Sequence, residues 1–270
     1  MSSDCCFLDT TVLVEALFKA EARRKSARAS IRSYKRSVLP VYAIKEMQLG
    51  ALKHFIWAHN KLSETASFST TLRAIQRIFM KPYLQGTALE AMQVGAELLV
   101  GSQLSLAQTR SETDAAMADA FRFSLRRRID RGWKERRKLT TETADNLTCF
   151  AETAPRFNES TKLIEIDPQG CSLEDSCCLA AKLRQRPKDL EALLKAIEGK
   201  SRPEDNKRRQ TLHLLKNTPK REVSDTACRA LGDAYFALRC PTDCAILTTN
   251  VKDHSVLAGA LHKKVDQHKA

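Results

Sequence analysis

Four acidic residues near the two ends of the chain have the side chains and the placement to hold a metal ion. They are Asp9, Glu46, Asp233 and Asp253. Carboxylates that cluster repel one another and raise each other's pKa values unless a cation neutralises them. Their hard oxygen atoms select Mg²⁺ or Mn²⁺, and such an ion can activate water and hold a phosphodiester for in-line attack. We therefore expect these four acids to be both metal ligands and catalytic residues.

Short apolar runs at both ends of the chain predict the strands that would bring these acids together. Strand patterns cover residues 5–9, 38–41 and 244–250, and helical patterns cover 12–31, 43–60, 224–238 and about 254–264. Asp9 directly follows a buried strand, a costly place for an acid unless it is paired or metal-bound. Ligands of an open parallel sheet bind beyond the carboxyl ends of its strands, where the strand order reverses. The pattern therefore predicts an α/β fold whose acids converge at that edge.

Between the two ends of the chain, the alternation of strands and helices stops and amphipathic helical patterns take over. These patterns cover residues 72–80, 88–100, 115–138, 175–183 and 190–197, and residues 163–167 form a short strand or an extended connector. We therefore divide the chain into an α/β domain, made from residues 1–60 and 221–270, and a mostly helical insertion, made from residues 61–220.

Four stretches that contain the acids follow one another in a specific order. They are Phe7-Leu8-Asp9-Thr10-Thr11-Val12-Leu13, Val38-Leu39-Pro40-Val41-Tyr42-Ala43-Ile44-Lys45-Glu46, Gly232-Asp233-Ala234-Tyr235-Phe236-Ala237-Leu238 and Ile246-Leu247-Thr248-Thr249-Asn250-Val251-Lys252-Asp253-His254. This order resembles the PIN-domain family of metal-dependent nucleases, which includes bacterial toxin ribonucleases. The resemblance implies a PIN-like three-layer fold with a short parallel sheet and a catalytic acidic quartet that binds Mg²⁺ or Mn²⁺. It also implies supporting roles for Thr11, Thr248 and Asn250.

The chain departs from the family pattern in ways that leave alternatives open. Asn250 stands where many members have Asp, and His254 stands where Phe is usual. Asp175 and Asp225 are rival candidates for the role of Asp233. Asp233 could also belong to a ladder of surface ion pairs along its helix, and Glu46 could be an ordinary acid near a helix start.

An excess of basic residues indicates an anionic partner, most often nucleic acid. The 270 residues include 45 Lys and Arg against 32 Asp and Glu, a net charge of +13. One basic run covers residues 23–36, and another, at residues 122–138, is interleaved with Phe121, Phe123 and Trp133. Arginines with aromatic neighbours suit phosphate contacts and base stacking, although solvated helix faces are the alternative. The residues of the second run that we predict to bind nucleic acid are Arg122, Arg126, Arg127, Arg128 and Arg131.

Two functions are compatible with these features, besides an interaction scaffold whose helical insertion docks a larger complex. The first is a Mg²⁺- or Mn²⁺-dependent nuclease that hydrolyses single-stranded RNA in a toxin or defence setting, with the second basic run facing the acids. The second is a catalytically weak or inactive PIN-like module that binds nucleic acid or protein. An inhibitory or complex-forming protein partner is compatible with either function. The chain has no apolar run of membrane-spanning length and no signal-peptide pattern, so we expect a cytoplasmic protein with reduced cysteines.

Overall fold

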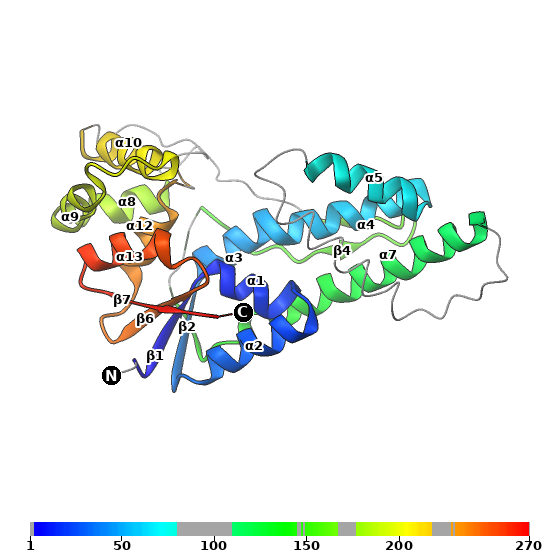
Figure 1. Cartoon of the computed structure of the whole chain (residues 1–270), viewed down its shortest axis with the longest axis horizontal. Helices are drawn as coiled ribbons and strands as arrows, with labels where there is room; N and C mark the ends of the chain where they lie inside the picture. The colour runs from blue at the N-terminus through cyan, green and yellow to red at the C-terminus, as the bar shows by residue number, and fades with distance from the viewer. Residues whose placement is uncertain are drawn as a thin grey trace.

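The apolar run before Asp9 forms the central strand of a parallel sheet in the computed structural model of the chain (Figure 1). The structure describes residues 3–79, 110–144, 147, 149–166, 177–217, 228 and 230–269. Within these residues the five strands of the sheet have the order β3-β2-β1-β6-β7, and all their pairings are parallel. The strands are β1 (Cys5–Leu8), β2 (Arg36–Pro40), β3 (Glu142–Ala144), β6 (Cys244–Thr248) and β7 (Lys264–Gln267). The prediction of an α/β fold is confirmed.

The strand order reverses between β1 and β6. After β1 the chain builds β2 and β3 on one side, and β6 and β7 then extend the sheet on the other side. Phe7 of β1 lies in register with Ile246 of β6, so segments more than two hundred residues apart meet at the centre of the sheet. Asp9 and Asn250 follow the carboxyl ends of these two strands, at the position where open parallel sheets bind ligands.

Burial explains why the two central strands have continuous apolar sequences. Every residue of β1 and of β6 is buried, as expected for parallel strands that are covered on both faces. Phe7 is fully buried and packs edge to face against Phe236, with ring centroids 6.0 Å apart. Tyr42 also packs against Phe236, at 5.7 Å. These aromatic contacts join β1 to the helices that carry Glu46 and Asp233.

The helix expected over residues 12–31 is two helices, α1 (Thr10–Phe18) and α2 (Glu21–Arg32). Lys19 has an extended conformation, which ends α1. The carbonyl groups left open at a helix end need donors, and arginine side chains supply them here. Arg28 donates to the Ala16 carbonyl at 2.9 Å, and Arg128 donates to the Phe18 carbonyl at 3.0 Å. These contacts offset the cost of breaking the helix.

The helix expected over residues 43–60 begins earlier and changes its winding. It consists of α3 (Val41–Met47), a π-helical turn (Gln48–Leu52) and α4 (Lys53–Thr65). Glu46 is the penultimate residue of α3, so its backbone is fixed by regular helix on the α3 side and by the π-helical turn on the other.

The middle of the chain supplies two groups of helices. Figure 1 shows α4, α5 (Phe68–Phe79) and α7 (Arg110–Glu135) side by side in an arm that projects from the sheet. The second group packs near α12 (Gly232–Arg239) and α13 (Val251–Ala260), with α8 against α12 and α9 against α13. Its members are α8 (Cys178–Arg184), α9 (Pro187–Ile197) and α10 (Pro203–Asn217). The helix predicted for residues 88–100 lies outside the described residues.

Several short elements escape sequence patterns because pairing partners create them. β3 comes from within the predicted insertion and pairs with β2, so the span 61–220 supplies an outer strand of the sheet. The last helix ends at Ala260 rather than near residue 264, and β7 then pairs with β6. β4 (Arg156–Phe157) and β5 (Ile164–Glu165) form a separate antiparallel pair, which is consistent with the short strand considered for residues 163–167.

The cysteines differ from the expectation that all of them are reduced. Cys5 and Cys244 lie opposite each other on β1 and β6 and form a disulfide with a Cα–Cα distance of 4.4 Å. The other cysteines in the described residues form no disulfide. No helix within the described ranges is long and apolar enough to cross a membrane.

Candidate active site

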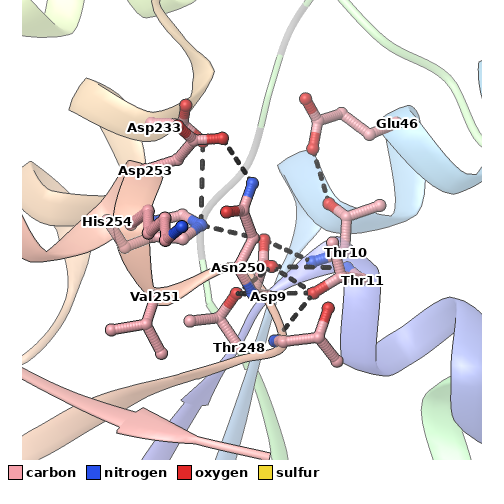
Figure 2. A network of polar contacts seen from close by, with 12 residues as sticks. Asp9, Thr10, Thr11, Glu46, Asp233, Thr248, Asn250, Val251, Asp253 and His254 are labelled. Carbon is pink, nitrogen blue, oxygen red and sulfur yellow. Dashed lines mark hydrogen bonds and ion pairs between the residues drawn. The ribbon is translucent and has the colours of Figure 1, made fainter. Parts of the chain in front are cut away.

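Asp9 is a buried carboxylate that caps a helix and accepts hydrogen bonds from several donors. Only 3% of the residue is exposed. Its Oδ1 accepts a hydrogen bond from the backbone N–H of Thr10 at 2.7 Å, and its Oδ2 accepts one from the backbone N–H of Thr11 at 3.4 Å, the second of which is the usual bond of an Asp at an N-cap. Its Oδ2 accepts hydrogen bonds from the hydroxyl groups of Thr11, at 2.6 Å, and Thr248, at 2.7 Å. The strand end, the helix start and β6 therefore fix this side chain in one orientation (Figure 2).

His254 of α13 is the cationic neighbour of Asp9. Its Nε2 lies 3.4 Å from Asp9 Oδ1 and 3.7 Å from Asp233 Oδ1, and its side chain is 3% exposed. Burial lowers the pKa of His254, but the hydrogen bond to Asp9 and the surrounding carboxylates raise it by more, so the net pKa is raised. Burial has the opposite effect on Asp9 and raises its pKa. The contacts with His254 and the two threonines outweigh burial, so the net pKa of Asp9 is lowered. The pair therefore favours an imidazolium beside a carboxylate.

Glu46 approaches Asp9 from the other side, through Thr10. The Thr10 hydroxyl donates to Glu46 Oε2 at 2.5 Å, while the Thr10 backbone N–H donates to Asp9. The pKa of Glu46 is raised to about 7, with burial as the largest cause; the charges of Asp233 and Asp9 contribute to the rise, and the Thr10 hydrogen bond opposes it. Glu46 is thus held where negative charge is in excess.

Asp233 lies in the first turn of α12 and connects His254 with a buried arginine. Its Oδ1 faces His254, and its Oδ2 accepts a hydrogen bond from Nη2 of Arg208. Burial raises its pKa, the charges of His254 and Arg208 lower it, and Asp9 and Asp253 raise it, with a net increase. Asp225 and Arg229, the other members of the ladder of surface ion pairs considered for Asp233, lie outside the described residues.

Asp253 lies in the first turn of α13 and is held by three neighbours. Its Oδ1 lies 3.1 Å from Nη1 of Arg202 and 3.5 Å from Nη1 of Arg208. Its Oδ2 accepts a hydrogen bond from the side-chain amide of Asn250, as Figure 2 shows. Asn250 thus contacts this acid directly, and its backbone N–H donates to the Thr248 hydroxyl at 2.9 Å.

The four predicted acids belong to one polar network whose other members come from α1, α10 and α13. Thr10 links Glu46 to Asp9, His254 links Asp9 to Asp233, and Arg208 links Asp233 to Asp253. No three of these acids, all of which the structure describes, have carboxylate oxygens that all lie within 4.8 Å of one another, as the ligands of one ion would. In the described part of the chain, the group of three ligand atoms within 4.8 Å of one another is Cys5, Asp243 and Cys244. Both of those cysteine sulfurs are bonded to each other in the disulfide, so they do not offer thiolates.

The acids nevertheless have the donor chemistry that a hard divalent cation needs. Carboxylate oxygens are the ligands of Mg²⁺ and Mn²⁺. The raised pKa values of Glu46 and Asp233, caused by burial and by neighbouring acids, mark a place where further positive charge is favourable. Asp9, Glu46 and Asp233 are the better candidates for such an ion, because Asp253 is bonded to two guanidinium groups and Asp233 to one.

Several members of the network were not singled out from sequence. Thr10 and Arg202 carry no distinctive motif, and His254 stands out only as a departure from the usual Phe. Arg208 belongs to α10, a helix that lies in the middle of the chain. Its i, i+3 spacing from Asp205 was a visible signal of a local ion pair, which the structure contains at 3.1 Å. Nothing in that spacing indicated that the same guanidinium reaches Asp233.

The arginines of α7 are largely engaged in packing. Arg122 pairs with Asp119, and Arg126 pairs with Glu159 and lies over the Phe157 ring at 3.5 Å. Arg128 bonds the last residue of α1, at the opposite end of that helix from Asp9. Arg127 and Arg131 are exposed.

The aromatic residues beside those arginines differ in exposure. Phe121 and Trp133 belong to the hydrophobic core, with 1% and 8% of each residue exposed. The expectation that they stack on bases is therefore wrong. Phe123 is 62% exposed and remains available for stacking. The apolar residues at four-residue spacing along α7 face inward, which is why these two rings are buried.

Neither the rival acids nor comparison with known proteins decides which residues form the site. Asp175 and Asp225 lie outside the described residues. Comparison of the chain with protein-family models, with curated proteins and with solved structures finds no match. The assignment of the site therefore rests on the contacts and charges of the residues themselves.

Proposed function

We propose that this chain is a metal-dependent nuclease with a PIN-like site, and that its substrate is single-stranded RNA. The observation that carries the proposal is the buried Asp9 at the reversal point of the sheet, joined through short contacts to Glu46 and Asp233. Acids from distant parts of the chain are brought to the one edge of the fold where α/β sheets bind ligands. A purely structural role gives little reason to place a buried acid, Asp9, beside two further acids at this edge.

Asp9, Glu46 and Asp233 would hold Mg²⁺ or Mn²⁺ in this account. The bound ion would neutralise phosphate charge and lower the pKa of a water molecule that attacks phosphorus. Thr11 and Thr248 orient Asp9 by donating to one of its oxygens. Thr10 orients Glu46, and Asn250 orients Asp253. His254 holds a proton between Asp9 and Asp233, where it balances charge while metal is absent.

The charge of the chain and the exposed Phe123 favour a single-stranded nucleic acid as the substrate class, and we take RNA as the substrate to test. The net charge of +13 attracts a polyanion, and Arg127 and Arg131 offer exposed guanidinium groups on α7. Exposed Phe123 is close enough to Arg127 for a cation–π contact, at 5.8 Å, and offers a stacking face for an unpaired base. Single strands expose such bases, whereas duplexes do not.

The purified chain should cleave labelled single-stranded RNA when Mg²⁺ or Mn²⁺ is added, and a chelator should stop the reaction. The reason is that the acids need the cation both to hold phosphate and to activate water. Product formation on a denaturing gel measures the effect, with single- and double-stranded DNA in parallel. The proposal is contradicted if none of these substrates is cut at any concentration of either metal.

A second candidate is a module with this fold that binds RNA or protein without cutting. It is favoured by the fact that His254 and Arg208 already compensate the acids, and by the neutral Asn250. Binding without cleavage in both metals would support this candidate.

A further inference from the structure

Arg208 lies inside the acidic network and contacts three carboxylates at once. Its side chain is 9% exposed. Nη1 lies 3.1 Å from Asp205 Oδ1 and 3.5 Å from Asp253 Oδ1, and Nη2 donates to Asp233 Oδ2. These acids come from α10, α13 and α12, so one guanidinium joins three helices.

A neighbouring arginine, Arg202, also pairs with two of the three acids that Arg208 contacts. Arg202 makes a two-pronged contact with Asp205, from Nε at 2.7 Å and from Nη2 at 3.0 Å, and it also reaches Asp253 at 3.1 Å. The Arg202 side chain is 41% exposed and forms the outer edge of the cluster. Asp205 and Asp253 thus have a second cation in Arg202, whereas the arginine that pairs with Asp233 is Arg208.

Asp233 has two different sides as a result. Its Oδ1 faces the group that contains His254 and Asp9, and its Oδ2 faces Arg208. Paired divalent ions in nucleases commonly lie about 3.5–4 Å apart and share a carboxylate between them. In this chain the guanidinium group of Arg208 already supplies a positive charge beside Oδ2 of Asp233.

We propose that Arg208 is a positioning residue that takes the place of a second divalent ion, so that the site binds a single metal at Asp9, Glu46 and Asp233. This inference rests on the proposed nuclease function. Arg208 keeps Asp233 and Asp253 at a fixed spacing and balances their charge. A planar guanidinium with several donors is suited to this task, because it can bond two carboxylates in defined directions.

Metal counting on the full chain tests the inference. Calorimetric titration with Mn²⁺ should give one ion per chain for the wild type and two for Arg208→Gln, because the vacated carboxylates then attract a cation. Arg209→Gln is the matched control on the same helix. Arg209 bonds the Lys200 carbonyl and Asn206, outside the acidic network, so this variant should still bind one ion.

The rise in melting temperature that Mn²⁺ causes is a second readout, and the loss of a merely structural ion pair would not change that rise. Without metal, Arg208→Gln should melt at a lower temperature than the wild type, since three acids lose a shared cation. Mn²⁺ should raise the melting temperature of Arg208→Gln by more than that of the wild type or Arg209→Gln, because an additional ion binds the folded state. An equal rise in all three proteins contradicts the inference.

The outcomes separate this inference from the nuclease proposal. A wild type that binds two ions overturns the role of Arg208 and leaves the nuclease intact, and this count is decisive even if Arg208→Gln does not fold. One ion in both the wild type and a folded Arg208→Gln also overturns it. A wild type that binds none contradicts the metal site itself. In that case the single-metal inference fails together with the metal site.

Discussion

Asp9→Asn should lower metal-dependent RNA cleavage at least about a hundredfold, because changes to groups that only support metal ligands already cost about 10–100-fold. Asn keeps the shape of the side chain and is an equally good helix N-cap, so α1 should still form. It removes the negative charge that lies between His254 and the threonine hydroxyl groups. Initial cleavage rates at saturating Mg²⁺, with circular dichroism as the check on folding, measure the effect.

RNA affinity should separate from cleavage in the same variant. Binding is expected to depend on Lys and Arg contacts with phosphates, so Asp9→Asn should bind RNA about as well as the wild type. Asp130→Asn, an exposed acid on α7, is the matched control and should keep full activity. Equal cleavage by the wild type and Asp9→Asn would assign the activity to a contaminant and contradict the account.

Phe7→Ala should lower the free energy of unfolding by about 3–5 kcal/mol, which is typical of a large aromatic removed from a core. Phe7 is 0% exposed, lies at the centre of β1 and packs against Phe236. Its removal leaves a cavity two residues before Asp9, between the strands and helices that carry the site. Urea unfolding followed by circular dichroism measures the loss.

Phe123→Ala is the control for that measurement, since it removes the same side chain from a position that is 62% exposed. Its effect should stay within about 0.5 kcal/mol, as is usual for surface substitutions. Similar losses in the two variants would mean that β1 is not the centre of the core.

The central part of the fold is visible in the sequence because burial is encoded locally. β1 and β6 are parallel strands covered on both faces, and such strands have apolar runs that need no knowledge of their partners. Asp9 stands out for the same reason, as an acid placed directly after such a run. The stretch around Asp233 and the segment Thr248–Asp253 stand out by their order along the chain, which resembles the PIN-domain pattern.

The remaining features depend on contacts between segments that are distant in the chain. β3 and β7 are only three and four residues long and become strands by pairing with β2 and β6. The break between α1 and α2 is stabilised by Arg128, more than a hundred residues away. Arg208 likewise reaches Asp233 through the packing of the second helix group. Periodicity describes one segment at a time and therefore does not reveal such partners.

The most direct test of the central claim is a crystal of the wild-type chain soaked in Mn²⁺, with anomalous diffraction recorded to locate the ion. The account predicts an anomalous peak bonded to carboxylate oxygens of Asp9, Glu46 and Asp233, beyond the carboxyl ends of β1 and β6. An ordered crystal with no peak at these residues, at a manganese concentration that supports cleavage, would contradict it.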